Sequence, residues 1–132
     1  MLPIGLLLAG FAAGGPVAGA LGSTLTISIL YVLVAGVVIA AVCGYMAGLI
    51  GASNSPVSGV GILSSLGIAL LLAMIFGQGG DEATTKGLVA FALFVTAIIF
   101  GIATISNDNL QDLKTGQLVG ATPWRQQIAL VL

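Results

Sequence analysis

Residues 25–50 read LTISILYVLVAGVVIAAVCGYMAGLI, an apolar stretch without a single charged residue. As an α-helix it would be about 39 Å long at about 1.5 Å per residue, which exceeds the roughly 30 Å hydrocarbon core of a bilayer. An uncharged apolar stretch of this length is typical of a transmembrane helix. We therefore expect these residues to cross a membrane, with tilt or an overhang.

The rest of the chain has the same character. Of its 132 residues, 58% are hydrophobic and 5% are charged, and the mean hydropathy is +1.22. A soluble domain carries about a quarter charged residues, and here the first charge is Asp81. The sequence therefore predicts an all-α membrane protein, a polytopic helical bundle whose direct partner is the lipid bilayer.

Four apolar segments can be drawn within a single transmembrane region, residues 1–132. They cover residues of about 2–21, 25–50, 57–76 and 88–105, followed by a polar segment, 106–127. The first segment is interrupted by Gly14, Gly15 and Pro16, so we expect a kinked, a partial or a re-entrant helix. A secretory signal is the weaker alternative, because no basic residues precede it and apolar sequence resumes directly after it. The apolar residues at 128–132 resemble the start of another helix, so we expect a fragment of a longer protein.

The stretch GASNSPVSGVG, residues 51–61, separates two apolar segments without a charge. Pro56 suits the first turn of a helix, and Ser53, Asn54 or Ser55 could cap it. One interpretation is a surface turn. The other is a broken-helix junction that faces a cavity, because transporters bind ions and substrates at such helix ends. The stretch taken alone favours the surface turn; the rows of small residues, the shared membrane face and the family resemblance given below shift the preference to the junction, with Ser58 in its second half.

Small residues recur at every fourth position along two of the segments. The first row is Gly36, Ala40, Gly44, Gly48 and Ala52, and the second is Gly61, Ser65, Ala69, Ala73 and Gly77. Such rows let helix backbones approach closely in lipid, with an inclined crossing. We expect both helices to pack on other helices through Gly36, Gly44, Gly48, Gly61 and Gly77, although 20 glycines could also produce such rows by chance.

A second polar constellation follows the fourth apolar segment. Asp108 and Asp112 would share one helix face with Gln111, whereas Lys114 would point away. Two neighbouring carboxylates can share a proton or hold a cation, and the alternative is a solvated helix end. Trp124 and Arg125 read as an interfacial anchor. The basic residues Lys114 and Arg125 weakly favour a cytoplasmic side, which would place residues 51–61 on the same face.

The inventory of side chains excludes several functions. There is no histidine, and Cys43 is the only cysteine, so a His/Cys metal site and His-dependent catalysis are excluded and no cofactor is expected. Three basic residues make no nucleic-acid surface. We expect no enzyme, because the two aspartates would lie on one helix end rather than on opposing spans.

Two blocks of sequence resemble a known family. GLIGASNSPVSGVGI (residues 48–62) and NDNLQDLKTGQLVGATPWRQQ (residues 107–127) closely resemble the oligopeptide transporter (OPT) superfamily, in particular its prokaryotic branch. The resemblance implies an interior piece of a multi-pass secondary transporter in a bacterial or archaeal inner membrane. Its substrate would be small peptides or, as in the yellow-stripe-like branch, metal–chelator complexes, and its driving force a proton gradient.

The resemblance also implies roles for residues of both blocks. The first block would contribute Ser53, Asn54, Ser55 and Ser58 to the transport path, and the second Asp108, Gln111, Asp112 and Lys114. Our hypothesis for their roles is that the hydroxyls and amides bind the substrate, and that Asp108 or Asp112 carries the coupling proton or pairs with Lys114. Relatives often carry Gly where this chain has Asn107, and Asn where it has Ser55, which weakens any inference about the substrate. A channel and a small structural membrane subunit are the alternatives.

Overall fold

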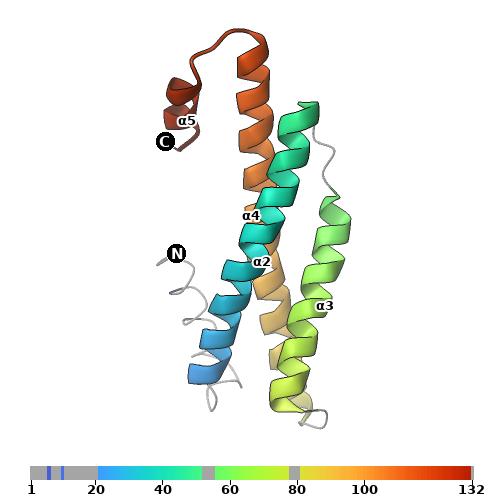
Figure 1. Cartoon of the computed structure of the whole chain (residues 1–132). Helices are drawn as coiled ribbons and strands as arrows, with labels where there is room; N and C mark the ends of the chain where they lie inside the picture. The colour runs from blue at the N-terminus through green and yellow to red at the C-terminus, as the bar shows by residue number, and fades with distance from the viewer. Residues whose placement is uncertain (1–5, 7–9, 11–20, 52–55, 78–80, 132) are drawn as a thin grey trace.

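The computed structural model describes residues 6, 10, 21–51, 56–77 and 81–131, and these form helices without any strand. The helices are α2 (Leu21–Ile50), α3 (Val57–Phe76), α4 (Glu82–Leu118) and α5 (Pro123–Val131), as Figure 1 shows. Nearly all of the first expected segment, residues 2–21, lies outside the described residues.

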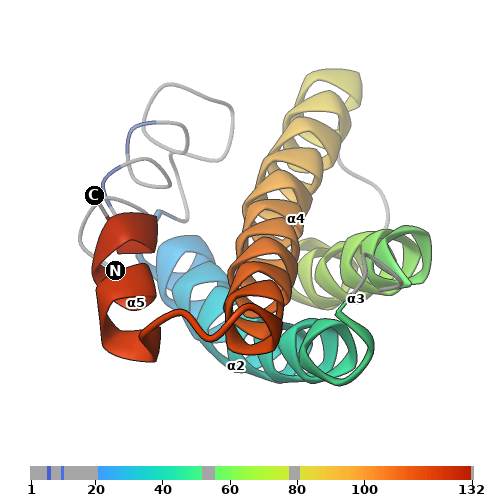
Figure 2. The same ribbon diagram turned by 90° about the horizontal axis from the view of Figure 1, so that it is seen from above.

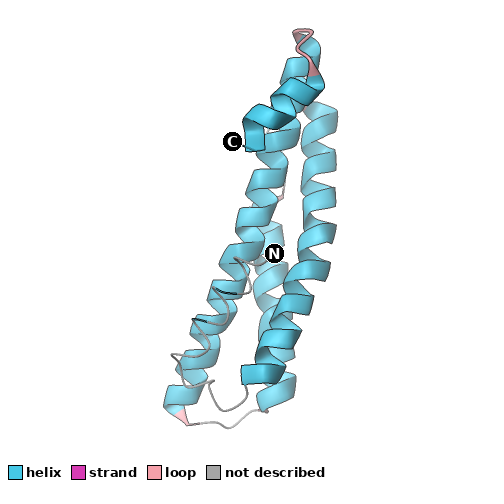
Figure 3. Ribbon diagram, turned by 90° about the vertical axis from the view of Figure 1, so that its left-hand side faces the viewer, coloured by secondary structure: helices cyan, strands magenta, loops and turns pink. Residues whose placement is uncertain are grey.

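Three of these helices, α2, α3 and α4, are long and apolar enough to cross a membrane. Together they form one elongated, wholly helical bundle (Figure 3). Large apolar side chains cover its outside, for example Val38 on α2 and Met74 on α3, which suits contact with lipid or with further helices. The predicted fold class, an all-α membrane segment, is confirmed.

Helix α4 is the centre of the arrangement, because α2, α3 and α5 all contact it. Helices α2 and α4 run in the same direction and α3 runs in the opposite one, while α5 turns back beside the end of α4 (Figures 1 and 2). The core between the helices contains Val32, Ile68, Phe91, Val95 and Ile99, all almost completely buried.

Glycines bring α2 close to α4. A Cβ placed on Gly36 would lie 3.0 Å from Cδ1 of Ile102, and one on Gly44 would lie 2.7 Å from Oγ of Ser106. Farther along, Gly48 faces Leu110, whose Cδ1 would be 3.6 Å away. The row of small residues on α2 therefore receives the side chains of α4, and larger residues at Gly36 or Gly44 would push the two helices apart.

In the row of small residues along α3, one glycine packs closely on α4 and another ends the helix. A Cβ on Gly61 would overlap the ring of Phe100 on α4, so this glycine is a close-packing position. Gly77 packs on none of the described helices, because a Cβ there would meet nothing within 4 Å. Its φ of 73° and its N–H bond to the Ala73 carbonyl (2.9 Å) show that it ends α3, a task that suits glycine.

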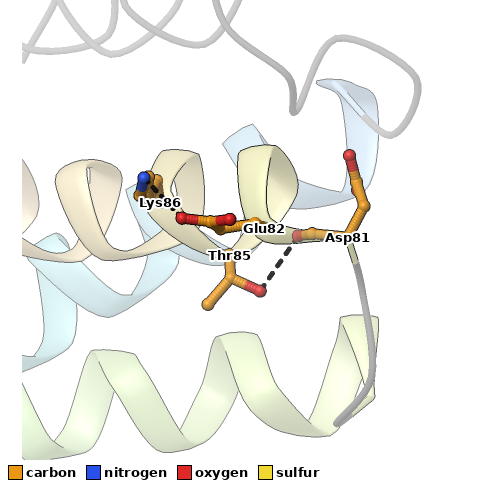
Figure 4. A network of polar contacts seen from close by, with 4 residues as sticks. All are labelled: Asp81, Glu82, Thr85 and Lys86. Carbon is orange, nitrogen blue, oxygen red and sulfur yellow. Dashed lines mark hydrogen bonds and ion pairs between the residues drawn. The ribbon is translucent and has the colours of Figure 1, made fainter.

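Helix α4 extends beyond the expected segment, 88–105, at both ends. Asp81 precedes its first turn: the Asp81 carbonyl accepts the Thr85 N–H (3.0 Å) and the Asp81 carboxylate accepts the Thr84 hydroxyl. Glu82 and Lys86 form a 2.7 Å ion pair one turn apart (Figure 4). At the other end the helix continues to Leu118, so the first half of the polar segment 106–127 is helical.

Gly61→Ala should destabilise the bundle, because the new methyl group would collide with Phe100. Overpacking of this kind typically costs about 1–3 kcal/mol, so the midpoint of thermal unfolding of the purified membrane protein should fall. Gly101→Ala is the matched control, since a Cβ at that exposed helical glycine meets nothing within 4 Å. Equal unfolding temperatures for the two variants would contradict the close contact.

Candidate transport-path site at one end of the bundle

The end of α2 lies beside the polar stretch of α4. Gly51 follows the last residue of α2 with a φ of 69°, and its N–H donates to the Ala47 carbonyl at 2.8 Å. A Cβ on Gly51 would lie 3.2 Å from Cγ of Lys114, so the lysine stem packs on this glycine. The start of the junction and the QDLKTG stretch therefore occupy the same end of the bundle, the upper end in Figure 1.

Most of the junction itself lies outside the described residues. Ser53, Asn54 and Ser55 belong to that gap, so their place in a transport path stays a prediction. Pro56 occupies the position directly before α3, where its side chain supplies no capping hydrogen bond and its carbonyl accepts the Val60 N–H at 2.9 Å. Ser58, in the first turn of α3, is exposed.

The second polar constellation lies wholly on α4, because that helix continues through it. Asp108, Gln111 and Asp112 are three and four residues apart and therefore share one side of the helix. Both aspartates are exposed and Gln111 is half-buried. This places two carboxylates and an amide together at the rim of the bundle, where they can bind an ammonium group, a proton or an amide.

Lys114 does not pair with these carboxylates in the part of the chain that the structure describes. Its amine donates to Oε1 of Gln117 (3.3 Å), and the ion pair recorded among the described residues is the one between Glu82 and Lys86. The lysine is thereby held toward Gly51 and Gln117. No three His, Cys, Asp or Glu side chains within the described ranges gather as a metal site.

Asn107, noted in the sequence only as a departure from the family pattern, is also a residue of this site. It is buried (3% exposed) and its Nδ2 donates to Oδ1 of Asp108 at 3.3 Å. The signal was present in the sequence, because Asn107 continues the buried stripe of Ile99 and Ala103 at spacings of four. A polar residue on the core stripe of a membrane helix is costly unless it is bonded, so it marks a position with a specific task.

Ser106 ties this polar stretch to α2. Its hydroxyl donates to the carbonyl of Ala40 at 2.7 Å, across the interface where Gly44 leaves room for it. A second interhelical hydrogen bond connects α2 to α3, because the Tyr31 hydroxyl donates to the Ser64 carbonyl at 2.8 Å. These interhelical bonds fix the register of the three helices below the polar end.

Helix α5 folds back on the end of α4. Gly116 is buried, and a Cβ there would overlap the amide of Gln126. The reversal passes through Gly120, whose φ is 74°. The Arg125 guanidinium lies 5.3 Å from the centre of the Trp124 ring, and both side chains are exposed. This exposed cation–π pair is compatible with the predicted interfacial anchor.

The described helices form a multi-pass membrane segment in which the polar stretch of α4 lies beside the end of α2. The family model described as "OPT oligopeptide transporter protein" matches residues 3–132, and the chain belongs to this family. The resemblance seen in the sequence is thereby confirmed.

One curated relative matches most of the chain. It is a Haemophilus influenzae protein named "Putative oligopeptide transporter", 48% identical over 126 residues that cover 92% of this chain and 20% of the relative. The chain thus spans about a fifth of the length of the curated relative it matches. No solved structure matches the chain.

Ser106→Ala should weaken the α2–α4 contact, because the Ala40 carbonyl loses its cross-helix donor. Interhelical hydrogen bonds in membranes contribute about 0.6 kcal/mol on average, so a small but measurable loss of unfolding free energy is expected. Thr104→Ala is the control: that exposed hydroxyl donates to the Phe100 carbonyl of its own helix (3.0 Å). A loss in Thr104→Ala as large as that in Ser106→Ala would contradict the assignment.

Proposed function

We propose that this chain is part of a secondary active transporter that moves small peptides across the cell membrane with protons. The observation that carries the proposal is the cluster of Asp108, Gln111 and Asp112 on one side of α4, at the end of the bundle where Lys114 packs on Gly51, in a chain of the OPT family. The printed name of the Haemophilus influenzae relative supports peptides as the substrate class.

A peptide offers an ammonium group, a carboxylate and backbone amides, and the proposed site has complementary groups. Gln111 can donate to and accept from a peptide amide. In the proposal the uncharged junction contributes further amide and hydroxyl groups, from Ser53, Asn54, Ser55 and Ser58. Such neutral groups can bind the peptide backbone, which is common to peptides of any side-chain composition.

The two aspartates are the candidates for coupling transport to protons. Both carboxylates are exposed, and neither forms an ion pair within the described part of the chain, so both are open to a ligand. Asp108 accepts a hydrogen bond from the buried Asn107 at 3.3 Å, which links this carboxylate to the buried stripe of α4. We assign the coupling proton to one of these two carboxylates and a supporting role to Lys114, whose charge lies at the same end of the bundle.

Asp108→Asn and Asp112→Asn test the coupling in the complete protein, reconstituted in liposomes with an imposed pH gradient. The variant of the coupling residue should lose uphill peptide uptake at least about tenfold, since a charge-assisted interaction of about 1.5–3 kcal/mol is removed. Its remaining uptake should no longer depend on pH, because asparagine cannot carry the proton. Glu82→Gln, at an exposed ion pair on the opposite end of α4, is the control.

Undiminished, pH-dependent uptake by both variants would remove the carboxylates from the mechanism. Exchange of labelled peptide against unlabelled peptide separates a transporter from a channel, because a channel does not perform counterflow. Uptake of a metal–chelator complex instead of peptides would identify the other substrate class.

In the same assay, Asn54→Ala should raise the KM for the peptide if the junction contacts the substrate. An unchanged KM would mean that residues 51–61 form a surface turn.

A further inference from the structure

An open apolar groove runs between α3 and α4, away from the polar end of the bundle. Its volume is about 730 Å³, and one face of each helix lines it, from Ile62 to Gly77 on α3 and from Thr84 to Leu93 on α4. On α3 this corresponds to about 22 Å of helix, roughly four turns. The groove is therefore long enough to receive another helix along its length.

Each hydroxyl among the described residues that line the groove already donates a hydrogen bond within the chain. Ser65 donates to the Ile62 carbonyl (3.0 Å), Thr84 to the Asp81 carboxylate, and Thr85 to the Asp81 carbonyl (3.2 Å). The remaining lining is apolar, for example Leu72, Leu88 and Ala92. Its occupant must consequently be apolar, which leaves a lipid chain or an apolar helix.

The floor of the groove favours a helix. Ser65, Ala69, Ala73 and Gly77, spaced by four, all line it, and the position of Gly77 is open, with nothing within 4 Å of a Cβ placed there. Small residues spaced in this way let another backbone approach closely. Larger side chains flank this row: Ile62 and Leu66 also line the groove and are 67% and 54% exposed, whereas Leu63, Leu70 and Met74, which are 71%, 56% and 83% exposed, lie outside its lining. Large side chains of this kind suit lipid, whose tails need no close approach.

We propose that this groove seats a transmembrane helix from another part of the same protein. The length of the family relative supports this occupant, because the matched region is 20% of it and four-fifths of such a chain remains to be packed. The groove would then join this segment to the rest of the transporter. The inference concerns assembly and holds whether or not the substrate is a peptide.

Spin labels on α3 test the proposal in the complete protein, reconstituted in liposomes after its native cysteines are replaced by serine. Nitroxides at Ala69 and Ala73 should show a severalfold lower accessibility to dissolved oxygen than nitroxides at Leu70 and Met74. Equal accessibility at all four positions would mean that lipid fills the groove and would overturn the proposal. Strong dipolar broadening between labels at Ala69 in two copies would identify a second copy as the occupant and would also overturn it.

Unlabelled variants keep the test decisive if the labelled protein does not fold. Ala69→Leu should lower the unfolding temperature or abolish folding of the complete protein, because a bulkier side chain obstructs a seated helix. Leu70→Met, which changes a side chain of similar size outside the groove lining, should leave folding intact. An Ala69→Leu protein as stable as Leu70→Met would show that nothing rigid occupies the groove.

Discussion

The close approach of α2 to α4 is the contact on which the rest of the structure depends. In lipid, apolar side chains gain nothing by leaving one hydrocarbon environment for another, so helix association relies on close packing and on interhelical hydrogen bonds. Both are present here: Gly36 and Gly44 admit side chains of α4, and Ser106 donates to the Ala40 carbonyl. A bulky residue at Gly44 would remove both contributions at once.

This contact determines where the polar residues lie. Since α2 and α4 run in parallel, the end of α2 and the last turns of α4 meet, and Lys114 packs on Gly51. Helix α4 is continuous from the ion pair of Glu82 and Lys86 to the polar turns near Leu118. The aspartates are thus displayed from a helix held by the bundle, and Asn107 connects the buried stripe to Asp108.

Much of this could be predicted from the sequence, for physical reasons that differ between elements. Apolar runs without charge identified the membrane helices, and the predicted segment 57–76 coincides with α3. Helix α4 is longer than the predicted apolar segment 88–105, because hydropathy falls after Ile105 whereas the leucines, glutamines and lysine that follow still favour helix. Gly77 shares its spacing with packing glycines, but it directly follows the last residue of α3, has a positive φ and packs on none of the described helices. The packing of Lys114 on Gly51 joins distant residues, and no local pattern encodes it.

Disulfide trapping between α2 and α4 is the most direct test of this account. A Cβ on Gly48 would lie 4.0 Å from the Leu110 Cβ, within the roughly 3.5–4.5 Å that a disulfide spans. In the complete protein, with its native cysteines replaced by serine, Gly48→Cys with Leu110→Cys should oxidise readily in membranes and resist a maleimide mass tag. The pair Gly48→Cys with Leu118→Cys should stay reduced and take up the tag. If the first pair oxidised no better than the second, the close parallel packing of α2 and α4 would be wrong.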